Sequence, residues 1–185
     1  MALSGLVLVA FVSGHMIGNL KVFQGAVALN DYAAWLQGNP LLWGIRLFML
    51  AIIIAHIAAA LWLVLGNRAA RPQRYVLQVS QYTGIAARSM AVSGVLVLLF
   101  LVFHLLHLTI GVVQPEIAAV LDQTGRPDVY HRVVAGFETP WIALVYMLSV
   151  ALVGLHLQHA VASLIRTLGF SNANFHRTID YGGSL

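Results

Sequence analysis

The chain has 185 residues, of which 60% are hydrophobic and only 9% charged, with a formal net charge of +4. A soluble domain usually has about a quarter of its residues charged, so this composition excludes a globular protein surrounded by water. The absence of cysteine excludes disulfides, protein-held iron–sulfur clusters, thiolate zinc sites and covalently attached haem. The few clustered basic residues indicate membrane topology rather than nucleic-acid binding.

Four apolar stretches are long enough to cross a bilayer as helices, which takes ~20 residues. In chain order they cover 3–23, 41–65, 90–113 and 141–168. We predict an all-α integral membrane bundle, 1–185, forming a single domain with short interfacial helices such as 27–36. No internal repeat at a fixed period is obvious. His15 and Asn19 interrupt the first stretch, which has neither a charged start nor a cleavage site, so it is predicted to be a span and not a signal peptide.

Charge predicts the orientation of the spans. The connection between the second and third spans has no acidic residue and contains Arg68, Arg71, Arg74 and Arg88. The connections 24–40 and 114–140 are acidic or mixed. By the positive-inside rule, the arginine-rich connection and the N-terminus are cytoplasmic. We therefore predict a multi-pass protein of the cell membrane.

Histidines are the best metal ligands within the predicted spans, and every span contains at least one. They are His15, His56, His104, His107, His156 and His159. A polar side chain in a membrane helix is costly and usually faces a partner, and this distribution favours haem ligation over separate hydrogen bonds. Counted from the inner boundaries, His15 and His104 lie ~6–9 Å further out than His56 and His156. We predict that each of these two pairs holds one b-type haem through two imidazoles.

Spacing does not choose within the two H-x-x-H pairs, because His107 and His159 lie on nearly the same helix faces as His104 and His156. Glycines would let a porphyrin edge approach a helix, and polar groups would meet its propionates. The other cofactor-binding candidates are Gly5, Gly94, Arg46, Arg88, Ser89 and Ser93. Close helix packing explains the glycines equally well, as an interfacial location explains Arg46.

Quinone contacts are predicted in the outer connection, where hydrogen-bonding side chains follow the third span. The candidates are Tyr130, His131 and Glu138, with His107 nearby. The alternative is that these are ordinary solvated loop residues.

The order of the motifs resembles a known family over nearly the whole chain. The motifs are GHMIGNL at 14–20, ALNDYAAWL at 28–36, AHIAAALWL at 55–63, NRAARP at 67–72, SGVLVLLFLVFHLLH at 93–107, DVYHRVVAGFETPW at 128–141 and GLHLQHAVASLIRTLG at 154–169. Together they resemble the cytochrome b membrane anchor of succinate dehydrogenase and fumarate reductase, in its single-subunit, two-haem form.

This resemblance implies that His15, His56, His104 and His156 are the axial ligands of two haems. It also implies flavoprotein and iron–sulfur subunits on the cytoplasmic side. Electrons from succinate would pass through the inner and then the outer haem to a quinone, menaquinone, with no chemistry on succinate in this chain. The family usually has five spans, whereas four are predicted in this sequence. Gly154 stands where some relatives have a membrane glutamate that helps to move protons.

Two other functions fit a membrane bundle rich in histidine. One is the di-haem cytochrome b subunit of a formate dehydrogenase or hydrogenase, against which the motifs of the connections argue. The other is a transporter or channel that uses membrane histidines as a proton relay.

Overall fold

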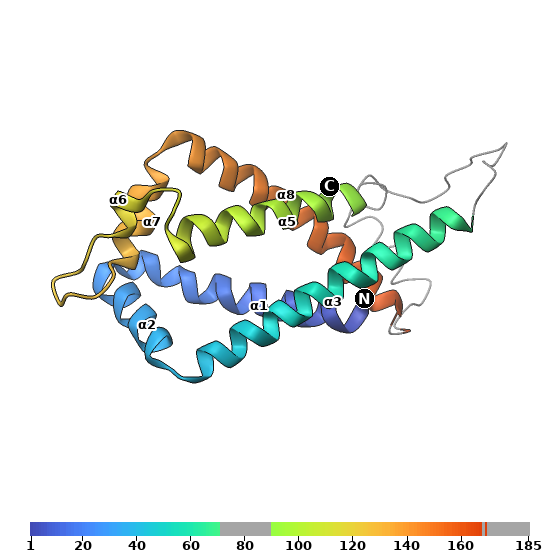
Figure 1. Ribbon diagram of the computed structural model, residues 1–185, viewed down its shortest axis with the longest axis horizontal. Coiled ribbons are helices and arrows are strands. Elements are labelled where there is room, and N and C mark those ends of the chain that lie inside the picture. The colour runs from blue at the N-terminus through green and yellow to red at the C-terminus, as the bar shows by residue number, and fades with distance from the viewer. Residues whose placement is uncertain (71–89, 168, 170–185) are drawn as a thin grey trace.

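The structure is a computed structural model that describes residues 1–70, 90–167 and 169, which fold into helices joined by turns (Figure 1). The long helices are α1 (Ala2–Asn19), α3 (Leu41–Ala69), α5 (Met90–His104) and α8 (Pro140–Thr167). The short ones are η1 (Leu20–Gln24), α2 (Ala26–Gly38), η2 (Leu105–Ile110), α6 (Pro115–Ala118) and α7 (Val129–Phe137). Within these residues no strand forms beyond an isolated bridge between Leu121 and Pro127.

Four helical segments are long and apolar enough to span a membrane. They are Ala2–Gln24, Leu41–Ala69, Met90–Ile110 and Pro140–Ile165. Many of their large apolar side chains are exposed, including Trp62 at 80%, as lipid-facing side chains are. The chain is therefore an all-α, multi-pass membrane protein, and the predicted fold class is confirmed.

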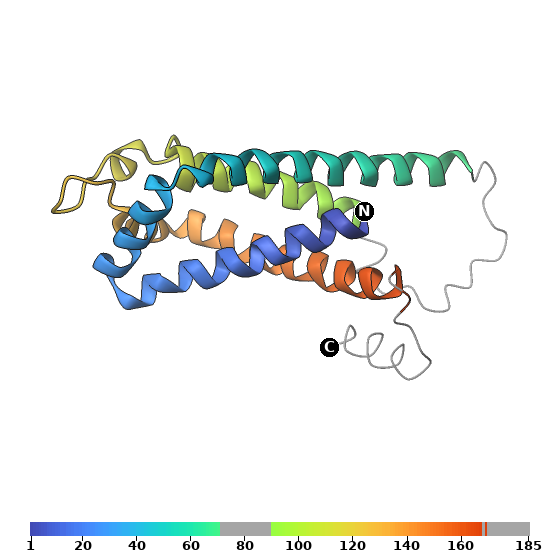
Figure 2. The same cartoon turned by 90° about the horizontal axis from the view of Figure 1, so that it is seen from below.

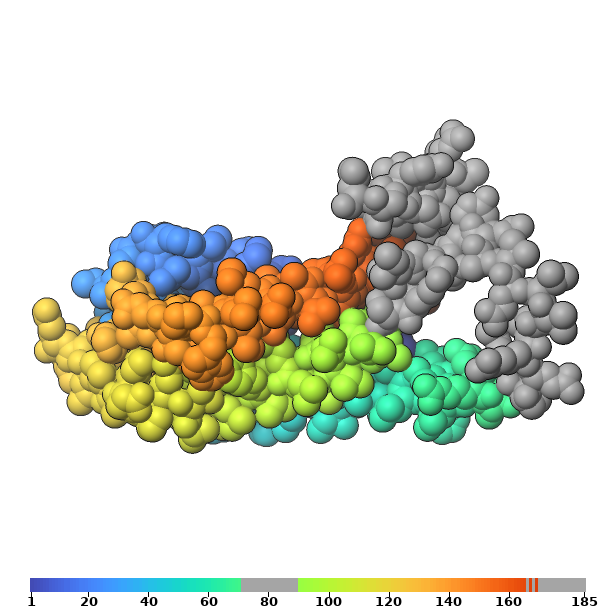
Figure 3. Space-filling model, turned by 90° about the horizontal axis from the view of Figure 1, so that it is seen from above, coloured from blue at the N-terminus to red at the C-terminus, as the bar shows by residue number. Residues whose placement is uncertain are grey.

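The four long helices pack in alternating directions. α1 and α5 run one way, and α3 and α8 run the other (Figures 1 and 2). α1 packs against α3 and α8, and α5 packs against α8. Figure 3 shows α8, in orange, lying along α5, in green. We call the end of the bundle that carries α2, α6 and α7 the capped end, and the opposite end the N-terminal end.

The third span ends in a wide turn, three residues earlier than predicted. After His104 the α-helix widens into η2, a π-helical segment, and the amides of Gly111 and Val112 both donate to the Leu106 carbonyl at 3.0 Å. Gly111 has a φ of +83°, and a Cβ there would lie 2.5 Å from the Ala118 side chain, so the turn needs glycine. Arg132 then donates to the carbonyls of Leu108 and Ala118, which lie near the ends of η2 and α6.

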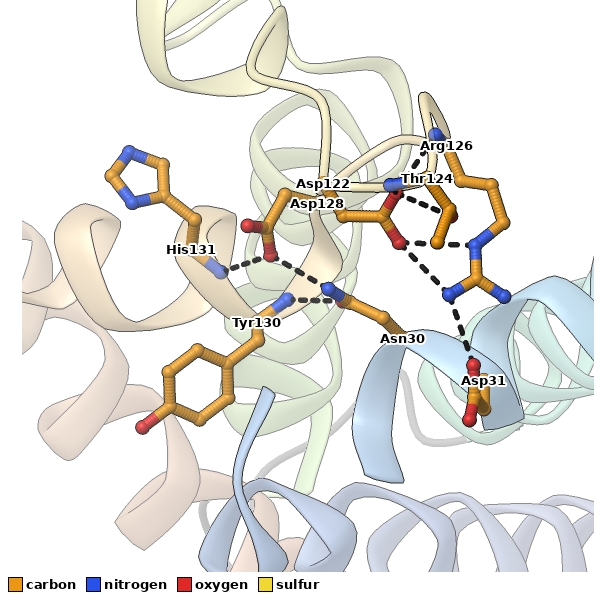
Figure 4. Close-up of polar contacts among 8 residues, drawn as sticks. All are labelled: Asn30, Asp31, Asp122, Thr124, Arg126, Asp128, Tyr130 and His131. Atoms are coloured by element: carbon orange, nitrogen blue, oxygen red, sulfur yellow. Dashed lines mark hydrogen bonds and ion pairs between the residues drawn. The ribbon is translucent and has the colours of Figure 1, made fainter. Parts of the chain in front are cut away.

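The capped end is held together by a buried amide between α2 and α7. Asn30 is only 5% exposed. Its Nδ2 donates to Asp128 Oδ1 at 3.0 Å, and its Oδ1 accepts from the Tyr130 amide at 2.9 Å (Figure 4). Asp128 also accepts from the His131 amide at 2.8 Å and so caps the N-terminus of α7. Asn30 thereby ties the first half of the chain to the second.

A charged turn reinforces this connection. Arg126 pairs with Asp31 of α2 and with Asp122, each at 2.9 Å (Figure 4). Asp122 also accepts hydrogen bonds from the hydroxyl and amide of Thr124 and from the amide of Arg126. The Thr124 hydroxyl, followed by the Arg126 amide, holds the pKa of the Asp122 carboxyl well below its usual range.

This turn should persist at acidic pH. Because the folded pKa lies below the unfolded value of about 3.9, the stabilising contribution is present above that value and is lost only as pH falls through the folded pKa. Hydrogen-exchange protection of the Thr124 and Arg126 amides, corrected for intrinsic rates, should be unchanged from pH 7 to pH 5. Asp122→Asn should accelerate their exchange by roughly fivefold or more, since both amides lose a charged acceptor.

Asp31→Asn is the matched control, because it weakens the ion pair with Arg126 and leaves the hydrogen bonds of the turn in place. Equal acceleration in both variants would show that the ion pair, and not the Asp122 turn, protects these amides.

Candidate metal centres

The structure brings His15 and His104 together near the capped end. Their ring centroids lie 5.9 Å apart, with the ring planes at 85°. Two imidazoles bound to opposite sides of one metal through bonds of about 2 Å would have centroids about 6 Å apart. The spacing of this pair therefore suits two axial ligands.

His56 and His156 lie at a second level, each beside the first turns of another span. His56 Nδ1 lies 3.1 Å from Ser4 Oγ, and a Cβ on Gly5 would lie 3.8 Å from its Cε1. His156 makes the same contacts with α5: Ser93 Oγ lies at 3.1 Å, and a Cβ on Gly94 would lie at 3.6 Å. Because α1 packs against both α3 and α8, and α5 packs against α8, the two rings lie at the same end of the bundle.

The two levels have the predicted order but are further apart than expected. His56 lies level with Gly5, and the helical rise from Gly5 to His15 is about 15 Å, more than the expected ~6–9 Å. The expected value assumed that Met1 and Gly66 lie at one height. In the structure α3 continues from His56 to Ala69, about 20 Å, so the ends of α1 and α3 lie at different heights.

Serine hydroxyls fix the tautomers of the histidines at the N-terminal level. Ser4 Oγ donates to the Met1 carbonyl at 3.0 Å, so it accepts the Nδ1–H of His56. Ser93 Oγ donates to the Met90 carbonyl at 3.1 Å and accepts the Nδ1–H of His156 in the same way. In a neutral ring this leaves Nε2 unprotonated, which is the form that binds a metal.

The hydrogen bonds favour His104 over His107 as the ligand in the third span. His107 is 2% exposed, and both of its ring nitrogens have partners. Nδ1 lies 3.0 Å from the Tyr146 hydroxyl, and Nε2 lies 2.9 Å from Gln114 Oε1. A metal would have to displace one of these groups, so His107 is better suited to a supporting position.

His15 differs from the other three candidates. Its ring is exposed and stacks on Phe11 at a centroid distance of 5.7 Å. Its Nε2 lies 3.1 Å from Asn19 Nδ2, an amide donor. Binding of a metal through Nε2 requires Asn19 to release that nitrogen.

α1 and α5 carry the same residues at the same spacing. In each helix a Ser-Gly pair is followed by a Phe six residues and a His ten residues after the glycine. Every position in α5 is 89 residues after its counterpart in α1, as Ser93 is after Ser4 and His104 is after His15. This short internal repeat was not predicted from the sequence. Ser4 was not predicted either, although its counterpart Ser93 was a predicted cofactor contact. Aligning the two spans with each other would have found both the repeat and Ser4.

The other predicted cofactor contacts are in varied surroundings. The guanidinium carbon of Arg46 lies 4.9 Å from the centroid of the Trp43 ring, and Arg46 is exposed, as expected for an interfacial arginine. His159 is half-buried on α8, close enough to His156 to interact electrostatically. Arg88 and Ser89 lie outside the described residues.

The predicted quinone residues Tyr130, His131 and Glu138 lie on or just after α7. The backbone amides of Tyr130 and His131 belong to the α2–α7 connection, and their rings point in different directions from α7 (Figure 4). Glu138 is exposed just beyond the end of α7.

The donor set suits a porphyrin better than a bare metal ion. No group of three or more potential ligands is found in residues 1–70 and 90–167, whereas the histidines occur in pairs. A porphyrin supplies four nitrogens itself and needs only two axial ligands from the protein. The paired imidazoles are the donor set that a haem needs, and Gly5 and Gly94 place no side chain between the helix backbone and the rings of His56 and His156.

The serine contacts can be measured by double-mutant cycles. The Ser4→Ala and His56→Ala changes should show a coupling of about 1 kcal/mol in unfolding free energy, because they share one hydrogen bond. Ser93→Ala and His156→Ala should show a similar coupling. Denaturant titration of the full chain in detergent provides the four stabilities of each cycle.

Ser13→Ala is the matched control, since the Ser13 hydroxyl donates only to the Val9 carbonyl of its own helix. A coupling between Ser13 and His56 as large as that of Ser4 would contradict the assignment.

Comparison with known proteins finds no matching family model, no matching curated protein and no matching solved structure. The chemistry of the paired histidines and the order of the sequence motifs therefore carry the functional interpretation.

Proposed function

We propose that this chain is the membrane-anchor cytochrome b subunit of a succinate:quinone oxidoreductase. It would pass electrons between an iron–sulfur subunit and a quinone, menaquinone, through two b-type haems. The observation that carries the haem proposal is the arrangement of four histidines from four spans as two pairs at two levels. The order of the sequence motifs supports the assignment to this family.

Each pair has a defined part in the proposal. His56 and His156 would supply axial nitrogens at the N-terminal level, with Ser4 and Ser93 orienting the two rings. His15 and His104 would do so at the capped level. With both axial positions taken by imidazole, a bound haem supplies one-electron transfer and has no open position for oxygen chemistry.

The positions of the partner subunits in the proposal follow from the proposed orientation. The arginine-rich sequence after α3 supports a cytoplasmic N-terminal end by the positive-inside rule. The flavoprotein and iron–sulfur subunits would bind at that end. Electrons would cross about 15 Å between the two levels and reach a quinone near the capped end.

A proton relay is the rival from a different functional class. Hydrogen bonds do connect His104, Tyr146, His107 and Gln114, but this path lies at the capped end. His56 and His156 are at the other level, and no hydrogen-bonded path between the levels is found in the described residues. Two separate levels suit electron transfer better than proton conduction.

Haem content tests the ligands. The purified full chain should show a b-type α band in its reduced-minus-oxidised spectrum. His56→Ala or His156→Ala should each remove one haem of two, and His15→Ala or His104→Ala should remove the other. Pyridine haemochrome analysis measures the haem remaining in each variant.

His159→Ala is the control and should retain both haems. A wild-type protein without the α band would refute the haem proposal, and loss of one haem in His159→Ala would reassign the ligand in α8.

The partner subunits test the family. Affinity purification of the chain from its native membrane should bring down a flavoprotein that oxidises succinate. A partner that oxidises formate or hydrogen would instead support the related di-haem subunits.

A further inference from the structure

We propose that Tyr146 and His107 are positioning residues that determine which nitrogen of His104 binds iron and set the potential of the haem at the capped level. This inference rests on the proposed haem function. It concerns four consecutive hydrogen bonds, which join residues from α5, η2, α8 and the connection between them.

The direction of the hydrogen bonds is set at the end far from His104. Gln114 Nε2 donates to Thr139 Oγ1 at 3.0 Å, so the amide oxygen of Gln114 faces His107. His107 Nε2 lies 2.9 Å from that oxygen and must carry a proton, because a carbonyl oxygen can only accept.

Each later hydrogen bond follows from the one before it. A neutral imidazole has one N–H, so His107 Nδ1 is a lone pair and accepts from the Tyr146 hydroxyl at 3.0 Å. The single proton of Tyr146 is then used, and its oxygen accepts the Nδ1–H of His104 at 3.3 Å. His104 is left with an unprotonated Nε2, ready to bind a metal.

The surroundings make these hydrogen bonds costly to break. His107 is 2% exposed and Tyr146 is 7% exposed. The rings of Phe103 and Phe137 lie against Tyr146 at centroid distances of 5.9 and 4.6 Å. Leaving a buried donor or acceptor without a partner costs more than the hydrogen bond contributes when it is made, and bonds in series strengthen one another in such an apolar setting.

The π turn accounts for the separate positions of the two histidines. In a regular α-helix, residues three apart lie on nearly the same face. The wider turn that begins at Leu105 changes the direction of His107 relative to His104. His107 thus reaches Gln114 and His104 reaches His15, with the Tyr146 hydroxyl between the two histidines.

The acceptor on His104 differs from those at the other level. His56 and His156 donate to serine hydroxyls, whereas His104 donates to a phenol oxygen whose own proton is drawn toward His107. An acceptor on Nδ1–H makes the ligand more basic, and a more basic ligand stabilises oxidised iron. Loss of the Tyr146 hydroxyl should therefore raise the potential of the capped-level haem alone.

Redox titration of the full chain in lipid nanodiscs, followed by optical and electron paramagnetic resonance spectra, tests this inference. Tyr146→Phe should shift one haem to higher potential and leave the other unchanged. Ser93→Ala should shift the other haem instead. His107→Leu removes the acceptor of the Tyr146 proton, so that Tyr146 donates to His104 Nδ1, and the capped-level haem signal should be lost.

Phe137→Leu is the matched control, since it alters packing against Tyr146 and no hydrogen bond. No shift in Tyr146→Phe, an equal shift in Phe137→Leu, or an unchanged capped-level haem in His107→Leu would overturn the inference and leave the proposed function intact. A wild-type protein without haem would overturn both.

Discussion

A neutral imidazole inside a membrane has one N–H and one lone pair, and hydrocarbon satisfies neither. Whichever group pairs with Nδ1 thereby determines what Nε2 can do. Ser4 and Ser93 take the Nδ1–H of one pair of rings, and Tyr146 takes that of His104. The close approach of α1 to α3 and of α5 to α8 brings these partners within reach, so helix packing and ligand chemistry depend on the same few contacts.

The pairs α1–α3 and α5–α8 resemble each other, yet they differ in what contacts the proposed ligand at the capped level. Tyr146 stands ten residues before His156 and reaches His104 across the helix pair. Arg46 stands ten residues before His56, but its guanidinium lies over Trp43. His15 is instead contacted by Asn19 of its own helix. His104 is therefore hydrogen-bonded from a neighbouring helix, whereas the printed hydrogen bond of His15 comes from its own helix.

Apolar length alone predicted the four spans, because nothing but a membrane suits so uncharged a chain. The spacing between the two levels could not be counted from span boundaries, since α3 extends far beyond the start of α1. The choice between His104 and His107 depends on Gln114 and Tyr146, which local periodicity does not bring together. The early stop at Ile110 is marked by Gly111, which has the left-handed conformation of a helix-ending glycine; the apolar run to Val113 concealed this signal.

The lengths of α3 and α8 make the bundle sensitive to bilayer thickness. At 29 and 28 residues they measure about 43 and 42 Å, against about 30 Å of hydrocarbon. Such helices must tilt or extend into the headgroups. Because α3 and α8 carry His56 and His156, a change of tilt would slide these rings along α1 and α5. The serine contacts resist that sliding and hold the imidazoles at one height as the surrounding lipid changes.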